Sequence, residues 1–251
     1  MERSAIFAVL FAIWFGLGDA RAQTSHELKL ALSAAASVSV KGPARASLGD
    51  GISFDIPEGM FLINGMPAIR ILRALGQPWD SNTLAIVIME AAKDGVSFAV
   101  ISNHETGYIA EGTADRLNPD SMLLKVSRKI RQASTALESR GLPGLMVTTW
   151  AEQPTYDRAK RRLTMAPIVR PKGITARRAR VEYGAFLLGR RGFITVSVPA
   201  PLNGMTEARR VAHAIADGIQ FEPGRRYEDF DRMTDGLLAL DITAVVEGVR
   251  R

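Results

Sequence analysis

Residues 180–198 read RVEYGAFLLGRRGFITVSV, two apolar runs joined by a polar turn at residues 189–192. Apolar runs on either side of a short, glycine-bounded turn are typical of a β-hairpin. In the second run, β-branched residues alternate with Thr195 and Ser197, the pattern of a strand with one packed face and one polar face. This stretch therefore predicts an antiparallel sheet with one face toward water.

Further strands and helices are predicted on both sides of this hairpin. Asp94-Gly95 separates two apolar runs and supplies the positive φ angles of a tight turn, while Asn118-Pro119 can cap a helix that ends before Gly141. The pattern predicts an α+β fold, an antiparallel sheet of about six to eight strands flanked by helices. The predicted strands are 52–56, 84–89, 96–101, 145–150, 163–169, 180–188 and 193–198, and the helices are 66–75, 119–140 and one capped by Thr206.

The first residues predict export. Arg3 precedes an apolar run at residues 5–18, and Ala20-Arg21-Ala22 has the small-x-small form of a cleavage site, so residues 1–22 are predicted to be a signal peptide. The run is shorter than the about 20 apolar residues of a membrane-spanning helix, which leaves an uncleaved N-terminal anchor as the alternative. We expect a periplasmic or envelope-associated protein.

The rest of the chain is predicted to be a flexible leader and one domain. Residues 23–47 are rich in Ala, Ser and Lys without a sustained period, which indicates the leader. Residues 48–251 have enough length for a single α+β domain with a C-terminal tail. Asp241 and Glu247 interrupt the apolar part of the tail, which argues against a membrane span there.

Composition narrows the chemistry. The chain has no cysteine and three histidines, so thiol nucleophiles and thiolate zinc sites are excluded and a metal site is not expected. It also lacks the glycine-rich nucleotide and hydrolase motifs, and no cofactor is predicted. The net charge is +6, which in an exported protein favours anionic membrane surfaces or acidic protein partners over nucleic acid.

The strongest charge asymmetry lies in residues 158–191, where Glu182 is the sole acid. One interpretation is a docking face for an anionic partner, and the other is that polar turn residues simply face water. Charge raises the local potential strongly only where the side chains converge in space. The basic candidates for binding are Arg161, Arg162, Arg177, Arg178 and Arg190.

Two further segments carry candidate binding residues. Trp150, Tyr156 and Asp157 flank a proline at a predicted strand-to-turn junction, where they could line a pocket or belong to the core. Carboxylates are dense at residues 228–235, where calcium binding and mutual ion pairing with neighbouring arginines are the two alternatives and ion pairing is preferred. From this region Tyr227 and Asp229 are binding candidates.

Four spaced motifs occur along the chain: Gly107-Tyr108-Ile109, Trp150-Ala151-Glu152 with Pro154, Tyr156 and Asp157, Leu188-Gly189-Arg190 with Gly192, and Gly224 with Arg226-Tyr227 and Asp229-Phe230. Together these motifs resemble a bacterial family of membrane-anchored envelope proteins without an assigned activity, the domain of unknown function 2167. The resemblance implies an envelope protein, although Glu111-Gly112 stands where the family usually has an acidic pair. The predicted architecture also looks like the small lumenal domains of the PsbP type, and a PsbP-like sandwich is compatible with it.

Three functions follow as hypotheses. The first is a non-enzymatic envelope domain that binds a protein or an anionic membrane surface through the basic side at residues 158–191. The second is a carboxylate-based hydrolase that uses Glu152 with Asp157, or Asp229 with Asp231, as an acid and base pair. The third is a purely structural envelope protein. The small-molecule ligand, if any, is not defined by the sequence.

Overall fold

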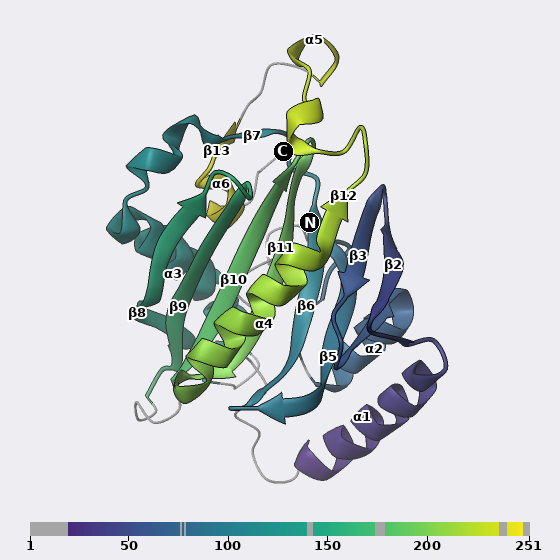
Figure 1. Cartoon of the computed structure of the whole chain (residues 1–251). Helices are drawn as coiled ribbons and strands as arrows, with labels where there is room; N and C mark the ends of the chain where they lie inside the picture. Colours follow the sequence, from purple (N-terminus) through teal and green to yellow (C-terminus); the bar gives the residue numbers. More distant parts are fainter. Residues whose placement is uncertain are drawn as a thin grey trace.

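A computed structural model describes residues 20–75, 77, 79–139, 143–173, 179–235 and 240–247. Its main feature is an eight-stranded antiparallel sheet in the order β1-β4-β5-β6-β11-β10-β9-β8 (Figure 1), which confirms the predicted α+β class. The strands are β1 (Val40–Lys41), β4 (Met60–Asn64), β5 (Thr83–Lys93), β6 (Val96–His104), β8 (Leu145–Asp157), β9 (Arg162–Pro171), β10 (Arg180–Gly189) and β11 (Gly192–Pro201).

The predicted hairpin lies in the middle of this sheet. β10 and β11 pair from Gly189 opposite Gly192 to Arg180 opposite Pro201. Gly192 has a φ of 147°, and a Cβ there would lie 1.8 Å from the carbonyl oxygen of His104, so only glycine fits against the end of β6. The central position of the hairpin explains why its sequence is so apolar.

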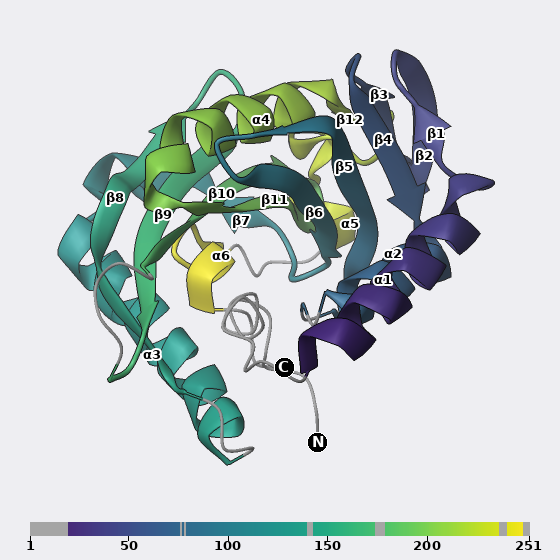
Figure 2. The same cartoon turned by 90° about the horizontal axis from the view of Figure 1, so that it is seen from below.

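Each face of the large sheet is covered by different elements (Figure 2). The α4 face packs against α4 (Met205–Gly218) and a three-stranded sheet, and the α3 face packs against the helices α1, α2, α3 and α6. The three-stranded sheet has the order β12-β3-β2, with β2 (Ala44–Gly49), β3 (Ile52–Ile56) and β12 (Ile219–Phe221). The other helices are α1 (Ala20–Ala36), α2 (Gly65–Ala74), α3 (Pro119–Glu138) and α6 (Ala244–Glu247).

Helix α3 has the N-terminal cap and the buried apolar stripe that its sequence predicts. Asn118 accepts a hydrogen bond from the Ser121 amide at 2.9 Å, which satisfies one free amide of the first turn. Met122, Val126 and Ile130 are buried against the sheet at helical spacing. The cap predicted for α4 is wrong, because that helix begins at Met205, before Thr206, and no side chain caps it.

One expectation about exposure is wrong, and one segment expected to be irregular contains helix and strand. Thr195 and Ser197 were expected to face water, but both are 6% exposed, because helices cover the α3 face as well. The leader predicted at residues 23–47 is instead occupied by most of α1 and by β1 and part of β2. An Ala- and Leu-rich segment has high intrinsic helix propensity without a regular apolar stripe, and α1 gains its stability by packing against α2.

Short elements connect the layers at the upper end of Figure 1, where β7 and β13 pair in parallel. Of the predicted signal peptide, residues 1–19 lie outside the described part of the chain, and residues 20–22 open α1. Within the described part, no helix combines the length and the apolar character that crossing a membrane requires. The short elements are β7 (Ile109–Ala110), η1 (Glu111–Arg116), η3 (Leu202–Gly204), η4 (Tyr227–Asp229), α5 (Arg232–Asp235) and β13 (Leu240–Asp241).

Candidate functional site

Irregular pairing of β8 decides where its side chains point. The register with β9 shifts at three places, one of them directly before Glu152 and another directly after it. Each extra residue reverses the alternation of faces, so Trp150 and Tyr156 pack on the α3 face while Glu152 lies on the α4 face. Trp150 fills a space beside α3, with its indole nitrogen donating to the Pro119 carbonyl at 3.1 Å. Trp150 is thus partly buried against the core.

Side chains from three distant segments meet around Glu111. They form what is here called the Glu111 cluster: Glu111, Tyr156, Arg158, Arg161 and Tyr227. Arg161 Nη1 donates to both oxygens of Glu111 at 2.5 and 2.6 Å, and the Tyr156 hydroxyl donates at 3.0 Å. Arg158 lies 3.7 Å from the same carboxylate and pairs with Asp115 at 2.5 Å. The negative charge of Glu111 is therefore balanced by two arginines of the same protein.

Local backbone geometry sets up this cluster. Arg161 adopts a left-handed φ of 49° in the turn between β8 and β9, and its guanidinium lies 5.1 Å from the ring of Tyr227. The Tyr227 hydroxyl donates to the Ile109 carbonyl at 3.0 Å and accepts from the Glu111 amide at 3.2 Å. These bonds hold η1, η4 and the β8–β9 turn in one arrangement.

Beside the cluster lies an open hollow of about 420 Å³, here called the aromatic groove. The ring of Tyr108 stacks on Phe230 at 3.8 Å with an interplanar angle of 10°, and on Tyr227 at 4.8 Å. Burial, followed by hydrogen bonding to Tyr227, raises the pKa of Tyr108, so its hydroxyl stays neutral. The groove is lined by Tyr108, Ala110, Glu111, Gly112, Tyr227, Phe230 and Arg232.

A second polar network lies on the α4 face. The hydroxyl of Tyr183 donates to Glu152 at 2.9 Å and contacts Nε2 of His213 at 2.9 Å, while Arg209 Nε donates to Glu152 at 2.6 Å. Burial lowers the pKa of His213, with the nearby Arg162 acting in the same direction. Every one of these polar groups has a partner, which is the arrangement of a structural network.

The basic candidates do not converge. Arg161 pairs with Glu111, whereas the next residue, Arg162, is buried on the α4 face and bonds to Asp217 at 2.8 Å. Arg190 bonds to both carboxylate oxygens of Asp235 at 2.7 and 2.9 Å. Arg177 and Arg178 lie outside the described residues. The candidates Arg161, Arg162 and Arg190 are therefore each paired with an acid from a distant segment.

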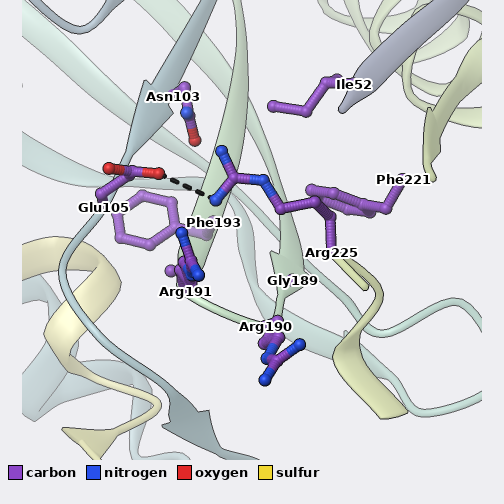
Figure 3. A pocket seen from close by; sticks show the side chains of 10 residues that line it. Ile52, Asn103, Glu105, Gly189, Arg190, Arg191, Phe193, Phe221 and Arg225 are labelled. Carbon is purple, nitrogen blue, oxygen red and sulfur yellow. Dashed lines mark hydrogen bonds and ion pairs between the residues drawn. The ribbon is translucent and has the colours of Figure 1, made fainter. Parts of the chain in front are cut away.

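The tip of the β10–β11 hairpin borders a small pocket of about 20 Å³ (Figure 3). Arg225 reaches across it to Glu105 at 3.1 Å and also donates to the Asp50 carbonyl at 2.6 Å. Arg191 is exposed and forms no ion pair with the described residues. The expected mutual pairing within residues 225–235 is wrong, because Arg225 and Asp235 both bind partners outside that run.

The acids proposed for hydrolysis have structural tasks. Asp157 accepts the Lys160 amide at 3.1 Å, and Asp229 accepts the amides of Gly224 and Arg226 at 2.7 and 2.9 Å. Asp231 accepts the Met233 amide at 2.9 Å. Each carboxylate thus stabilises a turn. Across the described residues, no group of three or more His, Asp or Glu side chains is positioned to hold a metal ion.

Sequence reasoning selected Tyr156, Arg161 and Tyr227, which the structure brings together, but it did not select Tyr108, Glu111 or Phe230. Two of these three carried a signal, because Tyr108 and Phe230 lie within motifs that mark the family resemblance. Glu111 stood out only as part of Glu111-Gly112, where the family usually has an acidic pair, and its partners lie far along the chain. Residues of three of the four motifs therefore meet at the aromatic groove and its supporting cluster, whereas Gly189, Arg190 and Gly192 line the small pocket instead.

No curated protein matches the chain. A solved structure that matches is the solution structure of cyanobacterial PsbP (CyanoP) from Synechocystis sp. PCC 6803, at 13% identity and a TM-score of 0.43, covering 71% of this chain and 91% of that one. The family model described as protein of unknown function (DUF2167) matches residues 40–250. The chain therefore belongs to the DUF2167 family.

Proposed function

We propose that this protein is an exported, non-enzymatic accessory domain of the cell envelope that binds a segment of a partner protein in the aromatic groove. The observation that carries the proposal is the open groove itself, about 420 Å³ beside the half-buried rings of Tyr108 and Phe230. Aromatic side chains give large contact areas at small entropic cost, and they are enriched at interfaces. The groove offers such side chains without requiring a rearrangement.

The Glu111 cluster supports this function by fixing the groove. Glu111 accepts hydrogen bonds from Arg161 and Tyr156, and the Tyr227 hydroxyl links η4 to the backbone of β7. Ordering a binding surface in advance removes part of the entropic cost of association. These charged residues therefore act as supports for the aromatic walls.

Charge in the groove favours an apolar segment that carries a carboxylate. Glu111 is already paired, whereas Arg232 is exposed and has no ion-pair partner in the described part of the chain. An unpaired arginine at the edge of an aromatic surface attracts an acidic group and accelerates association at low salt. We therefore expect the association to weaken as the salt concentration rises.

A hydrolase has less support than a binding domain. Glu152 and Asp157 lie five positions apart on one strand, roughly 15 Å by strand geometry. Glu152 is held by Tyr183 and Arg209, and Asp157 stabilises a turn, so neither carboxylate is free to exchange a proton with a substrate. Acid and base catalysis requires both groups within reach of one substrate.

The test is affinity purification of the C-terminally tagged full-length protein after cross-linking in envelope fractions, with mass spectrometry of the partners and of the protein's own N-terminus. We expect a reproducible protein partner that is lost in Phe230→Ala and weakened in Arg232→Glu. Leu124→Ala is the matched control, because Leu124 is an apolar side chain on α3 that is 67% exposed and does not line the groove. Equal recovery with all three variants would contradict the proposal.

Binding to an anionic membrane surface is the second candidate, favoured by one observation. Arg191 extends at the hairpin tip beside Arg225 (Figure 3), exposed and without an ion pair in the described residues. Sedimentation with vesicles that contain anionic lipid would separate the two functions. Binding that Arg191→Glu abolishes and Phe230→Ala leaves unchanged would support the membrane surface and count against the groove.

A further inference from the structure

Exposed apolar side chains are concentrated where α1, β1 and α2 meet. β1 follows α1 in the chain and pairs with β4, which leads directly into α2, and α1 packs against α2 (Figure 2). Single exposed apolar residues are ordinary on a folded protein, but a concentration of them marks an interaction surface. Of the ten large apolar side chains that are exposed in the described part of the protein, six lie on or beside these elements: Leu30, Leu32, Val38, Val40, Met66 and Trp79.

Helix α2 presents both apolar and basic side chains on its outer face. Its inner face includes Ala68 and Leu72, one turn apart, which belong to the core on the α3 face of the sheet. Met66, Arg70 and Arg73 follow one another at intervals of four and three residues, so they share the opposite side of the helix, and all three are exposed. The outer face of α2 is therefore both apolar and positively charged.

Trp79 extends this outer face. The guanidinium of Arg73 lies 4.2 Å from the centroid of the Trp79 ring, and Trp79 is 41% exposed. A tryptophan beside basic side chains is typical of the boundary between lipid hydrocarbon and headgroups, where the ring buries apolar surface and the basic groups reach the phosphates. Met66, Arg70, Arg73 and Trp79 are here called the α2 patch.

The charge of the α2 patch favours an anionic surface. Neither Arg70 nor Arg73 forms an ion pair with the described residues, and Asp80, the acid next to Trp79, accepts the Asn82 amide at 2.8 Å instead. In a symmetric contact with a second copy of the chain, the arginines of the two patches would repel each other. A layer of anionic lipid headgroups attracts both arginines.

We propose that the α2 patch docks this domain on an anionic lipid bilayer, with Met66 and Trp79 among the headgroups and the two arginines on lipid phosphates. The position of the patch supports this occupant, because α1 packs on α2 and begins at Ala20, just after the apolar run at residues 5–18. A retained run would leave the bilayer at this helix, and a cleaved one would leave the patch as a peripheral surface. The patch shares no residue with the aromatic groove or with the pocket at the hairpin tip.

The experiment uses the absence of cysteine from the chain. A single Met66→Cys substitution in the full-length protein carries one environment-sensitive fluorophore, which reports contact at the patch separately from any insertion of the N-terminal run. The labelled protein is titrated with phosphatidylcholine vesicles with and without phosphatidylglycerol. We expect a severalfold rise in fluorescence with the anionic vesicles, a weak response to the neutral ones, and loss of the response at high salt.

A second labelled position and two pairs of charge reversals serve as controls. Leu124→Cys, on α3 at a residue that is 67% exposed, should report no change. Arg70→Glu with Arg73→Glu should weaken the apparent vesicle affinity at least tenfold, since each basic residue near such a surface contributes roughly a factor of five. Arg128→Glu with Arg131→Glu makes the same change in net charge at the same spacing on the exposed side of α3 and should leave the affinity nearly unchanged. Arg191→Glu should also leave it nearly unchanged.

Three results would overturn the proposal. One is the absence of a response at position 66 to anionic vesicles. Another is a response that the reversals on α3 or Arg191→Glu weaken as much as the reversals on α2, since docking would then depend on overall charge or on the hairpin tip. The third is a response that appears without lipid as the protein concentration rises, since the patch would then bind a second copy. Phe230→Ala should not alter the vesicle response, so a failure of the groove and a failure of the patch are read separately.

Discussion

The two faces of the large sheet treat buried polar groups differently. On the α4 face, Arg162 is bonded to Asp217, and the Tyr183 hydroxyl is shared between Glu152 and His213. On the α3 face, one carboxyl oxygen of Glu182 and the hydroxyl oxygen of Thr195 have no hydrogen-bond partner among the described residues. Both faces belong to the same strands, so the difference arises from the alternation of side chains along each strand and from what covers each face.

The two faces therefore contribute differently to the free energy of unfolding. A fully paired polar network contributes to a single, well-ordered packing, whereas an unpartnered buried polar group lowers the free energy of unfolding. Sites at which a protein keeps such groups are expected to be functional. The α4 face is thus the side on which these buried polar groups are paired, and the α3 face is the side on which two of them have no partner among the described residues.

The largest expected effect concerns Glu182. Its folded pKa of about 8 lies above the ordinary 4.5, so between these values the folded protein holds a proton that the unfolded chain has released. Stability must therefore fall by roughly 4 kcal/mol as the pH rises from 4.5 to 8. Glu182→Gln should flatten this decline in denaturant titrations at several pH values. An unchanged slope would show that the α3 face does not destabilise the protein in this way.

His104, also on the α3 face, should have the opposite dependence. Burial lowers its pKa from 6.5 to about 4, with Asp80 opposing the shift and Lys129 adding to it. Between pH 6.5 and 4 the unfolded chain binds a proton that the folded protein does not, so stability should fall by about 3 kcal/mol as the pH drops. His104→Phe keeps the stacking on Phe193 and should abolish this loss. Thermal unfolding at pH 4.5 and 7 measures it, and an equal Tm drop in the variant would refute the assignment.

A smaller effect tests the pairing on the α4 face. Asp217→Ala leaves the buried guanidinium of Arg162 without its carboxylate, and we expect a loss of about 2 kcal/mol, reduced from the fully buried case because Asp217 is half exposed. Lys160→Met removes only the exposed partner of Asp217 and should change stability by less than about 1 kcal/mol. Equal losses in urea titrations of the two variants would mean that burial of Arg162 does not matter.

The smallest effect concerns Tyr183. Tyr183→Phe deletes a hydroxyl that binds both Glu152 and His213, and we expect a loss of about 1 kcal/mol. Thr195→Val, which deletes an unpartnered hydroxyl on the other face, should change stability in the opposite direction. Measuring both in one urea series makes the comparison direct, and two changes of the same sign would remove the distinction between the faces.

The local features of the fold could be predicted from the sequence. The hairpin turn at Asp94-Gly95 has the expected positive φ angles of 50° and 77°, and α3 begins at Pro119 as its cap indicated. The exposure of Thr195 could not be predicted, because alternation states that one face differs from the other without stating what covers it. Residues 23–47 were predicted to be a leader for a similar reason. Their order depends on packing against distant elements, which a local sequence pattern does not indicate.

The candidate site was predictable only in part. Tyr156, Arg161 and Tyr227 were selected for their type and spacing, and they do meet. The partner that unites them, Glu111, lies 45 and 50 positions from Tyr156 and Arg161, and no local pattern reports such a contact. The bulges of β8 add a second obstacle, because each one reverses the face on which the following side chains lie.

The shape of β8 has a consequence for association between copies of the protein. This strand is thirteen residues long and forms one edge of the eight-stranded sheet, a position at which exposed backbone groups can recruit a strand from another molecule. Its three register shifts and the backbone of Pro154, which has no amide hydrogen, interrupt any such ladder after a few residues. At the opposite edge, β1 has only two residues. Both edges thus resist the edge-to-edge growth that leads from a sheet to a fibril.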